Sequence, residues 1–249
     1  MWPSLQRWWG VILIVVAVSA TVWLGATQQL VLYIHPRYIV FTVVMALIAL
    51  VLGVMSIAIR PVSSDVPASK KTWSTVVGVV AVVLSGVVAV SLVILPPATL
   101  SSATASQRDI VGSTVGSDSQ NVDDVADADT SLIAGFTVVD WASLLRQTSD
   151  PSFYADKTAQ VIGFITPSDD DPDNIFYLSR FTVTCCAVDA QPAGVAVYAP
   201  NWSAEFAADE WVEVVGTFDT NPSSRSEVPL VLVPEKLSVV ERPSEPYLY

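Results

Sequence analysis

Cys185 and Cys186 are the only cysteines among 249 residues, and they stand next to each other in the stretch RFTVTCCAVDAQPAG, residues 180–194. Asp189 follows within the same stretch. Thiolates and a carboxylate are ligands that suit zinc or another thiophilic ion, although tetrahedral zinc would need a fourth ligand from water or a partner. The pattern therefore predicts a metal site made by Cys185, Cys186 and Asp189.

This prediction depends on where the strand that carries the cysteines ends. Neighbouring side chains of a strand point to opposite faces, so both thiols reach one ion only if the chain leaves the strand at Cys186. The residues that follow, AVDAQPAG, favour a turn there. Two alternatives stay open. The thiols can be structural, or they can form a vicinal disulfide with a redox role, which a location outside the cytoplasm would permit.

The sequence contains few of the residue patterns that other catalytic or binding sites need. The single histidine, His35, cannot supply a Ser-His-Asp or Cys-His arrangement, and the sequence contains no phosphate-binding glycine loop and no HExxH motif. We therefore expect no enzyme and no catalytic residues, and no substrate-binding residues can be named. The acidic stretches at 123–129 and 169–174 lack the glycine and glutamate of an EF-hand loop, so they are interpreted as tether and loop.

Apolar residues gather in three long runs before Pro96, in a chain that is 52% hydrophobic and 14% charged. The runs cover about residues 8–26, 38–59 and 73–95 and contain no Asp, Glu, Lys, Arg or His. Each has the roughly 20 residues that a helix needs to cross a bilayer. Because backbone polar groups must pair internally in lipid, we expect three transmembrane helices in a domain of residues 1–95.

Basic residues predict the orientation of these helices. Arg7 precedes the first run, and Arg60, Lys70 and Lys71 lie between the second and third. The positive-inside rule then places the N-terminus in the cytoplasm and everything after the third run outside the cytoplasmic membrane. Small residues along the second and third runs, including Gly53 and Gly86, predict a packing surface for another membrane protein or a second copy of the chain.

The sequence after Pro96 is polar and acidic, with seven basic residues against twenty-three acidic ones. Residues 96–131 are rich in Ser, Thr, Ala and Asp and show no apolar period, which predicts a flexible linker. An acidic domain has no basic groove for a phosphate backbone, so nucleic acid is excluded as a partner. Residues 132–249 remain as a separate domain outside the membrane.

This outer domain is predicted to begin with a helix and to continue as strands. Val138, Trp141, Leu144 and Leu145 have helical spacing, with Asp140 as the expected N-cap. Five short segments then have strand character: TAQVIGFITP, NIFYLSRFTVTC, AGVAVYAP, EWVEVVGTF and PLVLVPEKLSVV. Gly163 and Gly216 within strands favour a small closed OB-like barrel over a flat sandwich. The fold class is thus an α+β membrane protein.

Several motifs together resemble the YcgQ-like permease subunits of bacteria. They are YIHPR at residues 33–37, LPPATLSSATA after the last apolar run, Lys157 followed by VIGFI, RFTVTCCAVDAQPAG, WVEVVGTF and the terminal PSEPYLY. The resemblance covers almost the whole chain. It implies pairing with a larger integral membrane permease of the YcgR type.

From this resemblance we expect an accessory subunit of a two-component permease whose outer domain presents or captures a substrate, with a metal ion such as zinc as one candidate. The alternative is a stand-alone membrane-anchored binding or sensing module. The expected partners are the lipid bilayer and the permease subunit, and a homo-oligomer is a further expectation.

Overall fold

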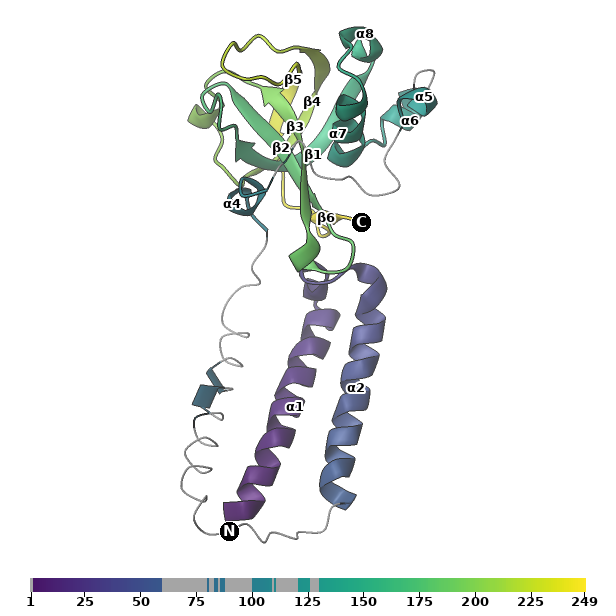
Figure 1. Ribbon diagram of the computed structural model, residues 1–249, viewed down its shortest axis with the longest axis vertical. Coiled ribbons are helices and arrows are strands. Elements are labelled where there is room, and N and C mark those ends of the chain that lie inside the picture. The colour runs from purple at the N-terminus through teal and green to yellow at the C-terminus, as the bar shows by residue number, and fades with distance from the viewer. Residues whose placement is uncertain are drawn as a thin grey trace. The chain divides into compact units, whose positions relative to one another are not determined.

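The protein divides into two compact units, Met1–Thr99 and Leu100–Tyr249 (Figure 1). The structure, a computed structural model, describes residues 2–59, 80, 83, 84, 86, 87, 100–108, 110, 121–125 and 130–249. Helices dominate the first unit and strands the second, as the sequence predicts for an α+β protein.

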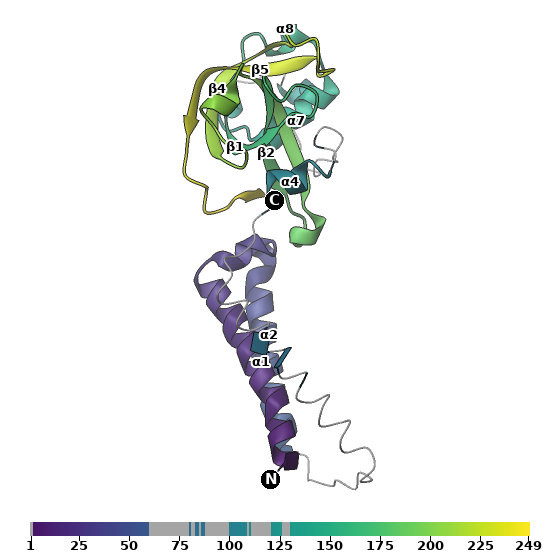
Figure 2. The ribbon, with the colours of Figure 1, turned by 90° about the vertical axis from the view of Figure 1, so that its left-hand side faces the viewer.

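The first unit contains two long helices, α1 (Trp2–Ala26) and α2 (Pro36–Ile59), joined by the 3-10 turn η1 (Gln29–Leu32). Proline suits the first position of α2 because its missing N–H would have no partner there. The two helices lie side by side in Figure 1 and overlap in the view of Figure 2. A Cβ atom added to Gly53 would lie 2.9 Å from Ile14 Cδ1, so Gly53 serves the contact between α1 and α2.

This contact gives Gly53 a role within the chain, and its predicted role in docking another membrane protein or a second copy stays a prediction. Its small size is already used inside the chain, where it lets the two backbones approach. A substitution at Gly53 would therefore disturb the helix pair itself.

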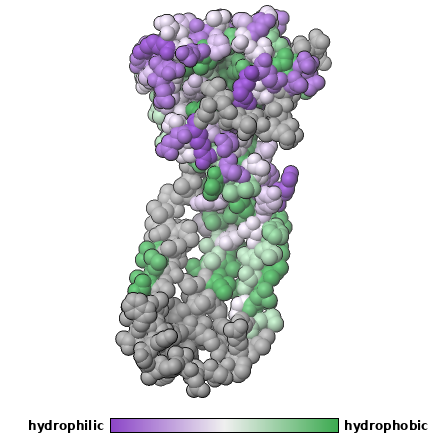
Figure 3. Space-filling view, in the orientation of Figure 1, coloured by the Kyte–Doolittle hydropathy of each residue, from purple (hydrophilic) through white to green (hydrophobic). Residues whose placement is uncertain are grey.

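Membrane spans are represented by one helix among the described residues. Pro36–Met55 is long and apolar enough to cross a bilayer, with a mean hydropathy of 2.7, and none of the residues in its apolar window is buried. Ile14–Ala26 forms a shorter apolar stretch. Figure 3 shows hydrophobic residues over both helices. The predicted third span at 73–95 lies outside the described residues, apart from residues 80, 83, 84, 86 and 87. These observations are consistent with a membrane association.

The second unit is built on a sheet of six strands. They are β1 (Thr158–Pro167), β2 (Ile175–Thr182), β3 (Gln191–Tyr198), β4 (Trp211–Thr220), β5 (Leu230–Val239) and β6 (Tyr247–Leu248). Strand β1 pairs with both β2 and β4, β2 pairs with β3, and β5 pairs with β3 and β4. The first five strands thus close into a ring, as a small closed barrel of the five predicted segments requires.

Two glycines allow the strands to approach one another. A Cβ atom on Gly163 would lie 2.8 Å from the carbonyl oxygen of Ser179 on β2. One on Gly216 would overlap the carbonyl oxygen of Val233 on β5, where the ladder of β4 and β5 shifts register. Neither glycine has a positive φ, so close backbone contact is the reason for glycine at both positions.

Helix α7 (Val138–Gln147) packs against this ring and is followed by α8 (Pro151–Tyr154). Trp141 is fully buried on α7 and contacts the rings of Phe136, Tyr154 and Phe218. The N-cap is Thr137 and not Asp140 as expected. Asp140 stands at N3, where its carboxylate accepts the Thr137 N–H at 2.8 Å in a capping box.

Parts of the predicted linker are packed and not free. Short helices form at α4 (Ser102–Ala105), α5 (Val122–Val125) and α6 (Thr130–Ile133). Ala105 is fully buried in a cluster with Phe164 and Phe181, and Val125 is fully buried in the main core. Residues 100–108 and 121–125 thus include apolar side chains that pack with residues of the second unit. The predicted linker residues 96–99, 109, 111–120 and 126–129 lie outside the described residues.

Candidate metal centre

The two cysteines lie in the connection between β2 and β3. Strand β2 ends at Thr182, which pairs with Gln191 at the start of β3, so the segment between them is a hairpin loop. The buried side chains of Val183 and Ala190 fix the two ends of this loop to the domain. The strand was expected to continue to Cys185. It ends three residues earlier, so neither thiol points into the core, and both are available at the loop.

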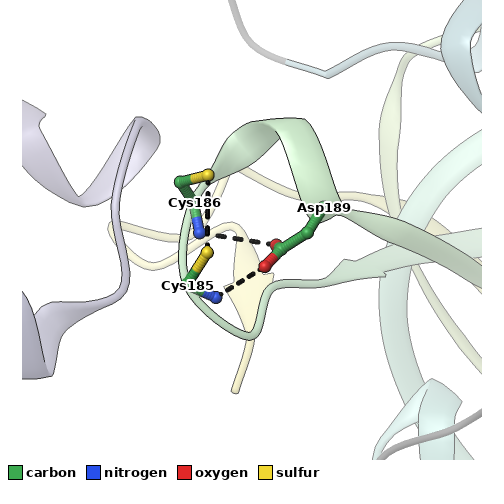
Figure 4. Close-up of side chains that lie close together, drawn as sticks. All are labelled: Cys185, Cys186 and Asp189. Atoms are coloured by element: carbon green, nitrogen blue, oxygen red, sulfur yellow. Dashed lines mark hydrogen bonds between the residues drawn. The ribbon is translucent and has the colours of Figure 1, made fainter.

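Asp189 shapes this loop through the backbone. Its carboxylate accepts N–H groups from Cys185 at 2.8 Å and Cys186 at 3.4 Å (Figure 4), and from Thr184 at 3.3 Å. A short 3-10 turn, η3 (Ala187–Asp189), closes when the Asp189 N–H donates to the carbonyl oxygen of Cys186 at 3.0 Å. One side chain thus turns three consecutive amides inward, which holds both cysteines on the same side of the loop.

The three predicted ligands are brought together by this turn. Sγ of Cys185 lies 3.6 Å from Sγ of Cys186, and the ligand atoms of the two cysteines and Asp189 all lie within 4.8 Å of one another. Cys185 is exposed, Cys186 is half-buried, and both thiols are free. The donor set of two sulfurs and one carboxylate oxygen fits a thiophilic ion that takes its fourth ligand from outside the loop.

The acid–base properties of the loop follow from the same contacts. Hydrogen bonding with Asp189 and with Cys186 raises the pKa of the Cys185 thiol from 9.0 to about 12. Burial acts to raise the pKa of Asp189, but hydrogen bonds from the Cys185 thiol and from three backbone amides outweigh it and lower the value below 3.8. At neutral pH the loop therefore holds an ionised carboxylate beside a protonated Cys185, whose proton an ion would have to displace.

The C-terminal segment braces the base of this hairpin. Strand β6 runs parallel to the end of β2, and the Val183 N–H donates to the Leu248 carbonyl oxygen at 2.9 Å. The Arg180 guanidinium donates to the carbonyl oxygens of Glu245 and Pro246, and it lies over the ring of Trp211 at 5.5 Å. Sequence reasoning had singled out PSEPYLY as a motif without finding this role, because only the fold places residues 180 and 245–248 together.

The second acidic stretch, residues 169–174, is a structural loop as interpreted from the sequence. Asp171 is 1% exposed and accepts hydrogen bonds from Ser223 Oγ at 2.6 Å and from Asn174 Nδ2 at 2.9 Å. It also forms a salt bridge with Arg225, whose guanidinium lies 3.1 Å from Asp173. The hydrogen bond from Ser223, with those from Asn174 and Arg225, lowers the pKa of Asp171 below 3.8 despite its burial. The carboxylate has no remaining face for a metal ion.

Comparisons with known proteins add a domain assignment. Residues 132–249 match the DUF1980 C-terminal domain, so such a domain is present in this chain. None of the curated proteins compared with the chain matches it. Among solved structures, the chain is similar to the one titled OBody AM3L09 bound to hen egg-white lysozyme, with 14% identity over 38% of this chain and 90% of that chain. The TM-score of 0.24 is too low to carry an argument about fold or function.

The matched domain begins where the predicted outer domain begins, at residue 132, and it includes the cysteine hairpin. This agreement is broadly consistent with the YcgQ-like resemblance drawn from the motifs.

Proposed function

We propose that the chain is an accessory subunit of a two-component membrane permease, and that its outer domain captures a thiophilic metal ion, zinc or a similar one. The observation that carries the metal proposal is the convergence of Cys185, Cys186 and Asp189, with their ligand atoms within 4.8 Å of one another. In this role the ion would displace the thiol protons of both Cys185 and Cys186, which pass to solvent, and bind the two thiolates. An exposed loop with one open coordination position can pass its ion to a partner.

The membrane part of the proposal rests on the sequence and on the first unit. Three apolar runs and the basic residues Arg60, Lys70 and Lys71 favour three spans with the N-terminus in the cytoplasm and residues 96–249 outside. The exposed apolar helix Pro36–Met55 supports a membrane location. The closed ring of five strands in the outer unit supports an OB-like barrel.

Metal capture is tested with the full chain, reduced and held in lipid nanodiscs. Zinc binding is measured by competition with a chromophoric chelator for the wild type, for the Cys185→Ser/Cys186→Ser variant and for Thr184→Ser as a matched control in the same loop. We expect the double variant to bind zinc more than about 100-fold more weakly, because loss of a ligand costs more than loss of its supporting contacts. Equal affinity of the double variant and the wild type would overturn metal capture.

The partner is tested by affinity purification from native membranes in mild detergent. A permease subunit that co-purifies in stoichiometric amount supports the accessory role. Recovery of the chain alone, under conditions that preserve other membrane complexes, would replace it with the stand-alone binding or sensing module.

The orientation is tested by labelling intact cells with a membrane-impermeant maleimide. Cys185 is exposed, so it should react from outside without lysis. A denatured sample sets the full extent of labelling, since the raised pKa of Cys185 slows its reaction. If Cys185 of the folded protein is labelled only after the cells are lysed, the outer domain lies in the cytoplasm instead.

A further inference from the structure

A cleft of about 320 Å³ opens in the second unit, away from the cysteine hairpin. It lies between α7 and the outer face of β2 and β3, and the β4–β5 connection forms its remaining wall. Helix α7 lies alongside the strands in Figure 1. The volume is at the lower end of the roughly 300–1,000 Å³ of small-molecule sites, so the cleft suits a ligand of a few heavy atoms up to a dipeptide.

Small residues on one face of β3 border this space, and Gly194 also packs against Ile110, because a Cβ atom at residue 194 would lie 2.5 Å from Ile110 Cγ2. Gly194 and Ala196 are two residues apart and therefore share a face, and Ala196 pairs directly with Tyr177 of β2. Leu145 from α7 and Leu230 from β5 add apolar wall. A cleft with this lining favours an aliphatic or aromatic group on the ligand.

Charged side chains of both signs stand around the apolar lining. Arg146 comes from the end of α7, Asp170 from the β1–β2 connection and Glu227 from the β4–β5 connection. Within the described ranges, no salt bridge joins any of these three to another side chain. All three side chains are exposed to solvent, and partial burial of the Arg146 guanidinium lowers its pKa. These charges therefore remain available to a ligand.

We propose that this cleft binds a free apolar amino acid as a zwitterion. Arg146 receives the carboxylate, Asp170 and Glu227 receive the ammonium group, and the apolar side chain lies against Leu145 and Tyr177. An arginine fork matches a carboxylate in two hydrogen bonds, which gives the contact direction as well as strength. The inference goes beyond the proposed function, since the cleft contains none of Cys185, Cys186 and Asp189.

The test uses the full chain in lipid nanodiscs, because detergent could itself occupy an apolar cleft. Binding of L-leucine, L-phenylalanine, glycine and the neutral analogue N-acetyl-leucine amide is measured by isothermal titration calorimetry. We expect saturable binding of leucine or phenylalanine, and at least about tenfold weaker binding of glycine and of the neutral analogue, from lost apolar contact and lost charged hydrogen bonds respectively. Absence of saturable amino-acid binding, or equal binding of the neutral analogue, overturns the proposal. All four compounds are measured on the wild-type chain, so the result does not depend on a variant folding.

Variants then assign the charges. Arg146→Gln should weaken binding at least about tenfold, whereas Arg242→Gln, an exposed arginine outside the cleft, should not. Glu227→Gln is compared in the same way with Glu241→Gln. Equal effects of each variant and its control would show that the cleft does not bind an amino acid as a zwitterion. The Cys185→Ser/Cys186→Ser variant should bind the amino acid unchanged, so failure of this proposal and failure of metal capture are separately visible.

Discussion

Two loops of the second unit are each organised by one aspartate, yet the two carboxylates have opposite surroundings. Asp171 is buried and is surrounded by Arg225, Ser223 and Asn174. Asp189 receives backbone amides and the Cys185 thiol, and among the described residues no cation lies within salt-bridge distance of it. A carboxylate paired with a guanidinium and hydroxyl groups serves the fold. A carboxylate that lies beside two thiols can still act as a ligand.

The comparison also shows why sequence spacing alone cannot identify a metal site. DDDPDN at 169–174 has more carboxylates than the cysteine stretch, but two of the three side chains that bind Asp171 come from residues 223 and 225, on the β4–β5 connection. The Cys185–Asp189 turn is local, so its contacts lie within five residues of sequence.

The largest expected effect concerns zinc and pH. If two thiols must lose protons on binding, zinc affinity should rise by up to about 100-fold for each pH unit between about pH 6 and pH 7. Asp169→Asn, which removes an exposed acid from the other loop, should leave this dependence unchanged. Chelator competition at several pH values measures both. A pH-independent affinity would show that the thiols are not the ligands.

The next effect is on stability. Asp171→Ala leaves the Arg225 guanidinium and two hydrogen-bond donors without their acceptor, so the midpoint of thermal unfolding should fall by about 5–10 °C. Asp189→Ala, at a more exposed loop, should lower it clearly less. Differential scanning calorimetry of the full chain compares the two. A larger loss for Asp189→Ala would reverse the roles assigned to the two loops.

A smaller effect concerns thiol reactivity. Because Asp189 is the largest cause of the raised pKa of Cys185, Asp189→Asn should lower that pKa and speed alkylation by iodoacetamide at about pH 8 by about tenfold. Mass spectrometry locates the modified thiol, and Asp169→Asn serves as the control. An unchanged rate would mean that the carboxylate does not govern Cys185.

The smallest effect is the acid dependence of stability. Both aspartates have a pKa below the ordinary 3.8 in the folded protein, so each contributes stability that is present above that value and lost as the pH falls through the folded pKa. Asp171→Asn should flatten the loss of stability between about pH 5 and pH 3 more than Asp189→Asn does. Urea unfolding across this range measures the difference, and equal slopes would contradict it.

Much of the fold of the second unit was predictable from local patterns. The segment TAQVIGFITP coincides with β1 at Thr158–Pro167, and each of the other four predicted segments overlaps one strand, with bounds that differ by at most two residues apart from the early end of β2. The helix around Trp141 was also found, although its cap was assigned to the wrong residue. Hydrophobic periodicity and turn-forming residues between segments predict helices and strands well, because both depend on residues that are close in sequence.

The candidate metal site was likewise visible in the sequence, since Cys185, Cys186 and Asp189 are close along the chain and a turn follows. The end of β2 at Thr182 could not be predicted from the sequence, because it depends on pairing with β3 and β6. The packing of Ala105 and Val125 was hidden for the same reason, since it depends on strands far along the chain.

The sequence by itself determined the alternation of elements, the apolar runs and the three candidate ligands, because these depend on residue type and short spacing. Only the tertiary structure decided which carboxylate is saturated, which glycines admit a neighbouring backbone, and where α7 leaves a cleft beside Tyr177 and Gly194. These features depend on contacts between residues distant in sequence. Their energies are set by burial and mutual geometry, which one-dimensional spacing does not record.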